Sequence, residues 1–321
     1  MQAGLEKQTP AAEDVVGLDL SNGIISAARL VLHADGALSL KQAGWTAVAP
    51  GASDRELATA IRAVWRSAGF PSRTVCASLR SRAGILRYFS YPAMEQAELA
   101  SALALEAEDS LQLPGDQILV DWHLNHQRRR PAPGPSSRRE GLLAAVPRKD
   151  VQQELDLLRR AGLYPVAIDL GATAIGNLFQ AMHTDTATYE DTCVLNLTRQ
   201  GADIVVLFEG DSLYARTIYA SGPSWEESLS SLLEGVQDAL KYYVFKLRGQ
   251  PARRLVVSGR RPAVPDFLEQ LRTRTGLPVE WWDPLARLAA GTRAARRVLA
   301  DIGKPPLAIC LGLALRRYDH G

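Results

Sequence analysis

Short apolar runs divided by turn residues open the chain and return, in the same order, near its middle. From Val15 the runs VVGLDL, IISAARLVLH and LSLKQAGW are separated by SNG and ADG, which predicts a three-stranded meander. A helix over 53–70 follows, with Ser53 and Glu56 in a capping box, and then the strand TVCASL. The second half repeats this order as CVLNL, ADIVVLFEG, SLYARTIY, a helix from 224 and RRLVVSG. The pattern predicts two copies of one α/β unit.

A shorter sequence repeat occurs at the same place in both copies. AGLYPVAID at 161–169 and TGLPVEWWD at 275–283 each combine a glycine at a helix end, a Pro-Val strand start and a closing Asp. Each is followed by a helix candidate, GATAIGNLFQAM in the first copy and, after an Arg-rich stretch, PPLAICLGLALRR in the second. We therefore expect a disordered tail at 1–13, a first domain at 14–182 and a second domain at 183–321.

Extra material at about 82–160 interrupts the first copy. It reads as a strand, GILRYFSYP, a long helix, MEQAELASALALEAEDSL, two strands, QILVDWHLNH and EGLLAAVP, and a helix, KDVQQELDLLRRAG. This order predicts an inserted α/β subdomain. Between its two middle strands, RRRPAPGPSSRR has the composition of an exposed, mobile loop.

The basic side chains of this loop have two interpretations. They are Arg128, Arg129, Arg130, Arg138 and Arg139. The first interpretation is a solvated loop without a partner. The second is a peripheral contact with an anionic membrane surface, worth about 1 kcal/mol per residue.

Composition limits the partners and the compartment. The chain is 46% hydrophobic with a net charge of +2, which gives no global reason to expect nucleic acid. Its three cysteines are far apart in the sequence, which fits neither a disulfide framework nor a zinc cluster. We therefore expect the protein to reside in a reducing cytoplasm. The N-terminus is polar, and no apolar run reaches the roughly 18 residues of a membrane span, so any membrane contact is expected to be peripheral. We expect no metal site, because His123 and His126 fall on opposite faces of a predicted strand.

Three stretches point to a known family. They are YPAMEQAELASALALEAEDSLQLPGDQILVDWHL, LLAAVPRKDV and LAICLGLALRR. They contain a Pro-x-Met before a helix rich in Ala and Glu, a strand with an Asp-aromatic pair, and a helix start at Ala-x-Pro-Arg. In order and spacing, from Val15 to Arg317, the chain resembles the type IV pilus assembly protein PilM family, an actin-like ATPase branch related to the cell-division protein FtsA.

The resemblance implies a fold, a place and a partner. The implied fold is α/β and actin-like, with two RNase H-like subdomains and the inserted subdomain on the first. The implied place is the cytoplasm, at the inner face of the bacterial inner membrane. The implied partner is the N-terminal cytoplasmic tail of a PilN-like inner-membrane protein, which joins the alignment complex to the pilus motor. A groove beside the inserted subdomain would capture this tail as an extended peptide. Our candidates for the groove are Tyr91, Met94, Leu103, Glu106 and Leu113.

Relatives that bind ATP and magnesium use two phosphate hairpins and a glycine-rich adenosine loop. The matching positions here are Asp19, Ser21, Asn22 and Gly23 in the first hairpin, Asn196, Thr198 and Gly201 in the second, and Ser258 and Gly259 in the loop. Asn196 replaces an Asp, and a neutral amide neither holds hydrated magnesium nor acts as a base. Two cations, Arg260 and Arg261, follow the shortened loop. We expect neither catalytic residues nor a cofactor; the alternative for the two arginines is a new phosphate site.

The second half also lacks the insertion that walls the nucleotide cleft of such relatives. One amphipathic helix spans 224–249, and it leaves no room for further elements. We therefore predict a scaffold of type IV pilus biogenesis that captures a membrane protein's tail without turnover. The alternatives are an active ATPase of the pilus machinery, with ATP and magnesium, and a component like type II secretion GspL or of MSHA pilus biogenesis.

Overall fold

The computed structural model describes residues 15–21, 23–125, 138–183, 191–199, 201–208, 211–222, 225–247, 249–260, 266–301 and 305–316. Several predictions of the preceding section lie outside these residues. They concern the tail at 1–13, Asn22, His126, Arg128, Arg129, Arg130 and Arg261.

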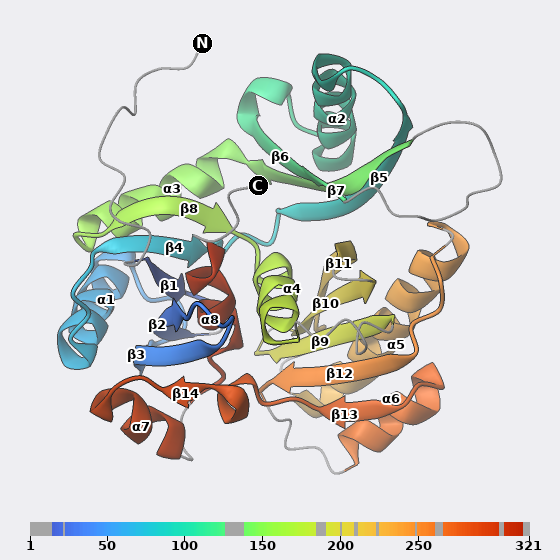
Figure 1. The fold of residues 1–321 in the computed structure, drawn as a ribbon. Coiled ribbons are helices and arrows are strands. Elements are labelled where there is room, and N and C mark those ends of the chain that lie inside the picture. Colours follow the sequence, from blue (N-terminus) through green and yellow to red (C-terminus); the bar gives the residue numbers. More distant parts are fainter. Residues whose placement is uncertain are drawn as a thin grey trace.

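A six-stranded sheet forms the first half, in the order β14-β3-β2-β1-β4-β8 (Figure 1). Its strands are β1 (Val16–Asp19), β2 (Ile24–Leu32), β3 (Leu38–Ala47), β4 (Thr74–Ser78), β8 (Tyr164–Asp169) and β14 (Ala289–Ala290). The first three form the predicted antiparallel meander, and β4 and β8 add to it in parallel. The helices α1 (Asp54–Ala68) and α3 (Arg148–Arg160) contribute buried leucines to the core beside β1.

A five-stranded sheet forms the second half, in the order β11-β10-β9-β12-β13. Its strands are β9 (Thr192–Thr198), β10 (Gly201–Phe208), β11 (Asp211–Tyr219), β12 (Arg254–Gly259) and β13 (Val279–Trp281). This order of a meander followed by two parallel strands repeats that of the first sheet. The predicted duplication is therefore confirmed.

One long helix, α5 (Trp225–Phe245), connects β11 to β12. Its apolar face buries Leu232, Val236, Ala239 and Tyr243 in the core of the second half, beside α6 (Phe267–Thr275). Among the described residues, no other helix or strand lies between β11 and β12. The predicted absence of a second insertion is therefore confirmed for this part of the chain.

Two helices lie between the sheets and tie the halves together (Figure 1). They are α4 (Gly171–Met182) and α8 (Ala308–Ala314). The backbones approach closely: a Cβ atom on Gly312 would lie 1.9 Å from the carbonyl oxygen of Ala174, and one on Gly17 would lie 1.9 Å from that of Cys310. Thus α8 follows the second sheet in sequence but packs on β1 of the first. A cut of the chain at 182/183 does not separate two packing units.

The inserted subdomain is a three-stranded antiparallel sheet with one helix. It consists of β5 (Ile85–Pro92), α2 (Gln96–Leu111), β6 (Ile118–Leu124) and β7 (Arg138–Pro147), in the sheet order β5-β7-β6. Arg138 and Arg139 belong to β7 and not to the preceding loop, which corrects our prediction. The strand begins earlier because Arg138 pairs with Pro92 and its guanidinium donates to both the carbonyl and the hydroxyl oxygen of Ser90, each at 2.7 Å.

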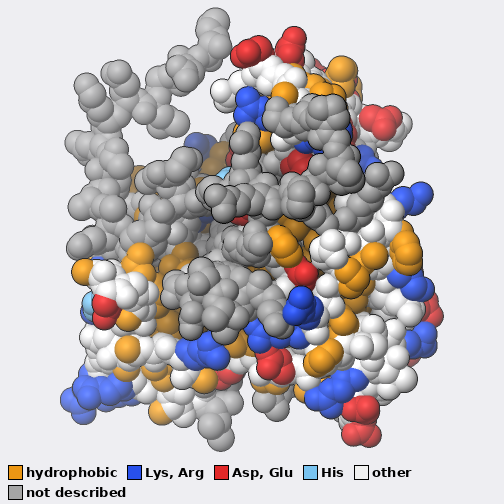
Figure 2. All heavy atoms as spheres, turned by 45° about the vertical axis from the view of Figure 1, so that its right-hand side comes forward, with side chains coloured by type: hydrophobic (Ala, Val, Ile, Leu, Met, Phe, Trp, Pro, Cys, Tyr) orange, Lys and Arg blue, Asp and Glu red, His pale blue; other side chains and the backbone are white. Residues whose placement is uncertain are grey.

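The chain returns to the first sheet before it ends. The 3-10 turn η3 (Pro284–Arg287) leads into β14, which pairs in parallel with β3, and then into α7 (Arg293–Ala300). None of the described helices is long and apolar enough to cross a membrane. On the face shown in Figure 2, the coloured Lys and Arg side chains lie among hydrophobic ones at several places.

Candidate functional site

The first phosphate hairpin keeps its carboxylate. Asp19 ends β1 and is buried, and its Oδ1 atom accepts hydrogen bonds from the Ser21 backbone N–H at 2.9 Å and the Ser78 hydroxyl at 2.8 Å. Burial raises the pKa of Asp19, and these hydrogen bonds oppose the rise. The residue is therefore an anchor between β1 and β4.

The second hairpin holds a neutral amide where the family pattern has a carboxylate. Asn196 of β9 pairs in register with Asp203 of β10 and is 2% exposed. Its Oδ1 atom has no hydrogen-bond partner among the described residues. Asp203 accepts a hydrogen bond from the Thr217 hydroxyl at 2.8 Å, and burial raises its pKa to about 6.

Gly201 allows β10 and β11 to pack closely at this hairpin. Its φ is +142°, and a Cβ atom there would lie 1.9 Å from the carbonyl oxygen of Ile218 in the neighbouring β11. The glycine is thus required by strand packing. Thr198 lies at the end of β9, half-buried.

A guanidinium group lies where the two hairpins face each other. A Cβ atom on Gly23 would lie 3.3 Å from a terminal nitrogen of Arg199, so this side chain reaches across to the first hairpin. A small cavity beside this guanidinium has a volume of about 40 Å³ and is lined by Asp19, Asn196, Arg199, Arg260 and the start of α8. Ligand pockets of proteins commonly measure roughly 300–1,000 Å³. This cavity by itself cannot hold a nucleotide.

The adenosine-loop positions pack on β9. Ser258 is 1% exposed, and a Cβ atom on Gly259 would collide with the backbone of Leu197 at 2.2 Å. The Arg260 backbone N–H donates to the carbonyl oxygen of Leu197 at 2.8 Å. Ser258 and Gly259 therefore line none of the three cavities described here.

A wider cleft includes residues of both hairpins and extends to the inserted subdomain and β11. Its volume is about 800 Å³, and its lining includes Asp19, Gly23, Thr198, Asp203, Arg82, Tyr219 and Tyr242. The guanidinium carbon of Arg82 lies 4.9 Å from the centre of the Tyr219 ring. The described residues contain no group of three or more His, Cys, Asp or Glu side chains that could hold a metal ion.

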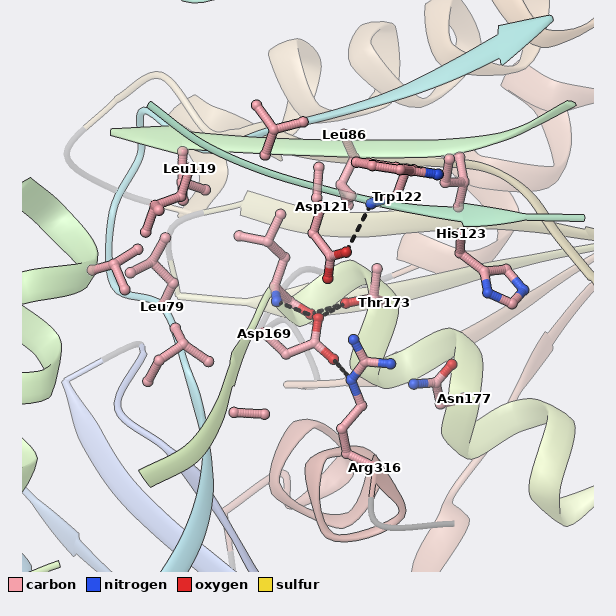
Figure 3. Close-up of a pocket in the computed structure, with 18 of the residues that line it drawn as sticks. Leu79, Leu86, Leu119, Asp121, Trp122, His123, Asp169, Thr173, Asn177 and Arg316 are labelled. Carbon is pink, nitrogen blue, oxygen red and sulfur yellow. Dashed lines mark hydrogen bonds and ion pairs between the residues drawn. The ribbon is translucent and has the colours of Figure 1, made fainter. Parts of the chain in front are cut away.

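A second cavity lies beneath the inserted subdomain (Figure 3). It has a volume of about 620 Å³ and is lined by β6, β8 and the first turns of α4. Both β6 and β8 are the outermost strands of their sheets. The cavity, which we call the β6–β8 groove, is therefore flanked by two strands whose outer backbone groups have no neighbouring strand in the described structure.

The β6–β8 groove has a polar floor and an apolar wall. Asp169, at the end of β8, accepts hydrogen bonds from the Leu170 backbone N–H at 2.8 Å and from the Thr173 hydroxyl. It also forms an ion pair with Arg316, whose Nε atom lies 3.1 Å from Oδ2. Figure 3 shows Leu86 of β5 and Leu119 of β6 on the opposite side and Asn177 beside Arg316.

The predicted groove residues lie elsewhere in the inserted subdomain. Leu103 is fully buried, and Tyr91 and Met94 pack beside it in the core between α2 and the three-stranded sheet. The Tyr91 hydroxyl donates to Glu106 of α2 at 2.9 Å, and Leu113 packs in the adjoining core. None of these five side chains lines the β6–β8 groove. They hold α2 on the sheet, and Leu103 has no surface to offer a peptide.

The residues of the groove had weak signals in the sequence. Trp122 and His123 belong to the strand pattern VDWHL, while Asp169, Thr173 and Asn177 are polar positions in an otherwise apolar run. Polar residues at the junction of a strand and a helix are the signal that could have identified them.

Comparisons with known proteins agree with this architecture. The model of the type IV pilus assembly protein PilM family matches residues 17–231. A solved structure described as the PilM-PilN type IV pilus biogenesis complex is 21% identical, with a TM-score of 0.76, over 96% of this chain and 99% of that one. A Bacteroides thetaiotaomicron protein with an actin-like ATPase fold and unknown function is 11% identical, with a TM-score of 0.50, over 91% and 97%. The comparison with curated proteins gave no match.

The fold is accordingly actin-like, with the inserted subdomain on its first half. The matched segment contains the first sheet up to β8, the inserted subdomain and the second meander. It therefore includes both hairpins and the strands that flank the β6–β8 groove, whereas Arg316 of the polar floor lies beyond it. The chain belongs to the type IV pilus assembly protein PilM family.

Proposed function

We propose that this protein is a scaffold of type IV pilus biogenesis that binds the N-terminal cytoplasmic tail of a PilN-like inner-membrane protein in the β6–β8 groove, without hydrolysing ATP. It acts in the cytoplasm at the inner membrane and joins the alignment complex to the motor. The observation that supports this most is the groove itself, flanked by two unpaired strand edges. The solved relative contains PilM together with PilN.

The groove suits an extended peptide for two reasons. Outer strand edges present backbone N–H and C=O groups, which an added strand satisfies in a regular ladder. The alternate side chains of that strand then meet different surfaces, the apolar wall at Leu86 and Leu119 and the polar floor at Asp169. Backbone bonding supplies affinity, and the two surfaces supply selectivity.

The polar floor of the groove is preorganised in the unbound protein. Asp169 is fixed by the Leu170 N–H, the Thr173 hydroxyl and Arg316. A fixed group loses little conformational entropy on binding. Arg316 is 34% exposed, so its guanidinium can also donate to a polar group of the tail.

The two hairpins are the reason that we propose no ATP hydrolysis. Asn196 supplies no charge for magnesium, and the Arg199 side chain lies against Gly23 of the first hairpin. A guanidinium in that place provides the positive contact to the first hairpin that a nucleotide complex would draw from lysine and magnesium. The two hairpins can then stay in contact without a nucleotide between them.

Two residues of β8 give a matched test of the groove. Val166 lines the groove and is 58% exposed, whereas Tyr164 is 67% exposed and lies outside it. Both accept arginine without loss of core packing. Val166→Arg is expected to weaken binding of a synthetic PilN-like tail by tenfold or more in isothermal titration calorimetry. Tyr164→Arg should bind like the wild type; equal binding by both variants would remove the groove from the proposal.

An active actin-like ATPase is the second candidate, favoured by the cleft of about 800 Å³ beside Asp19. A nucleotide there would place its phosphates near Ser21 and its base near Tyr219 or Tyr242. Titration with Mg-ATP distinguishes the two candidates. The system served, whether type IV pilus, MSHA pilus or a GspL-like role in type II secretion, follows from which PilN-like tail binds.

A further inference from the structure

A basic surface lies at the edge of the first sheet, far from the β6–β8 groove. Residues 284–300 contain four arginines, and the nearest carboxylates in the sequence are Asp283 and Asp301, one at each end of this stretch. All four are exposed, on η3 and α7 around the short strand β14. They are Arg287, Arg293, Arg296 and Arg297, which we call the β14 patch.

The four arginines of the β14 patch are not held in ion pairs with other described residues. Other arginines pair with carboxylates, as Arg80 does with Glu154 at 2.8 Å and Arg272 with Glu269 at 3.0 Å. In the part of the chain that the structure describes, no carboxylate forms an ion pair with any arginine of the patch. Lys41 adds a further cation, since its side chain packs against Gly291 and its carbonyl accepts a 2.6 Å hydrogen bond from the Thr292 hydroxyl.

The patch surrounds an open strand edge. β14 is the outermost strand of the six-stranded sheet, and its two residues, Ala289 and Ala290, are exposed. The N–H of Gly291 donates inward to Leu40 at 2.8 Å. Because successive residues of a strand direct their N–H groups to opposite sides, that of Ala290 faces outward. The alanines leave room for another backbone to approach.

We propose that the β14 patch docks an acidic, extended segment of a second protein. The open edge supplies backbone hydrogen bonds, and the four guanidinium groups supply bidentate partners for Glu and Asp carboxylates. The patch exposes no large hydrophobic side chain, since α7 turns Ala295, Val298 and Leu299 inward. A membrane-bound helix keeps such side chains for the acyl boundary, so the surface fits a protein segment better than a bilayer.

The position of the patch suits a bridging role. The β14 and β8 strands are the two opposite edges of one sheet, about 24 Å apart at the usual strand spacing. In Figure 1, α7 lies at the lower left and the inserted subdomain at the top. A tail in the β6–β8 groove and a segment on β14 would therefore be held at two ends of one rigid sheet. This bridging role rests on the proposed function, whereas binding at the patch does not.

Fluorescence anisotropy with the full chain tests the patch. The probe is a labelled peptide of about a dozen residues in which Glu and Thr alternate, long enough to pass β14 and both flanking arginine groups. The patch variant changes Arg287, Arg293, Arg296 and Arg297 to Gln. The matched control changes four exposed arginines of α1, α3 and α6 to Gln, namely Arg55, Arg66, Arg160 and Arg274. Both variants lose the same charge.

We expect the patch variant to lose tenfold or more in affinity for the Glu-Thr peptide and the control to lose less than threefold. Ala290→Pro, which removes the outward N–H and keeps the Gly291 bond, should also weaken binding at least threefold. Equal losses in the patch variant and the control would overturn the proposal, as would patch-dependent binding of anionic vesicles without binding of the peptide. The PilN-like tail should bind the patch variant normally, which separates failure here from failure of the proposed function.

Discussion

Arg199 of the second hairpin lies against Gly23 of the first, with a terminal guanidinium nitrogen 3.3 Å from where a Cβ atom on that glycine would be. A side chain of one hairpin thus contacts the other directly. This contact supports the proposal that the protein works without a nucleotide.

Asn196→Asp alone is not expected to give ATP hydrolysis. The change supplies a carboxylate, but the Arg199 side chain and the close packing of Gly259 on the Leu197 backbone remain. A phosphate-release assay with Mg-ATP should show no turnover above the buffer, in this variant and in Asn196→Asp combined with Arg199→Ala. Hydrolysis in the single variant would show that the missing carboxylate at position 196 alone prevents ATP hydrolysis.

The buried carboxyl of Asp203 should make stability depend on pH. Burial raises its pKa to about 6 from 3.8, so the folded chain binds the proton more tightly than the unfolded chain. This contribution is present below about pH 4, declines as the pH rises towards about 6 and then stays constant. At 1.36 kcal/mol per pKa unit, the loss is at most about 3 kcal/mol.

Asp203→Asn isolates this contribution. Burial also raises the pKa values of Asp19 and Glu154, which add slopes of the same sign. Urea unfolding at several pH values between about 4 and 7 should therefore give a shallower decline for the variant than for the wild type. Identical slopes would contradict the assignment of the titration to Asp203.

Gly312→Ala should loosen the joint between the halves. The added methyl would lie 1.9 Å from the carbonyl oxygen of Ala174, so α8 must move away from α4. We expect a loss of about 1–3 kcal/mol or more in the free energy of unfolding. Gly36→Ala is the control, because no atom lies within 4 Å of its Cβ position and only its positive φ opposes the change. A smaller loss at Gly312 than at Gly36 would mean that α8 packs differently.

The three cysteines should report global unfolding. Cys76, Cys193 and Cys310 are fully buried, and burial raises the pKa of each thiol. Ellman's reagent should therefore leave the native protein unmodified and react with all three in urea. Rapid modification of one thiol under native conditions would reveal a local opening, with Cys310 pointing to α8.

Periodicity predicted the repeated meander, the inserted subdomain and α5, because each buries one regular apolar face. It missed β14, since two alanines without alternation carry no strand signal. It also did not show which side chains of α2 are buried: Leu103, one of our candidates for a peptide groove, faces the three-stranded sheet. The packing of α8 on the first sheet is a long-range choice, visible only in close contacts such as that of Gly17 with Cys310.

The most direct test of the account is a pair of calorimetric titrations of the unmodified protein, one with a PilN-like N-terminal tail peptide and one with Mg-ATP. A scrambled tail serves as the control. A scaffold that captures the tail without a nucleotide should show one binding site for the tail, with a Kd in the micromolar range or tighter, and no heat of binding for Mg-ATP. Micromolar binding of Mg-ATP without binding of the tail would contradict the account.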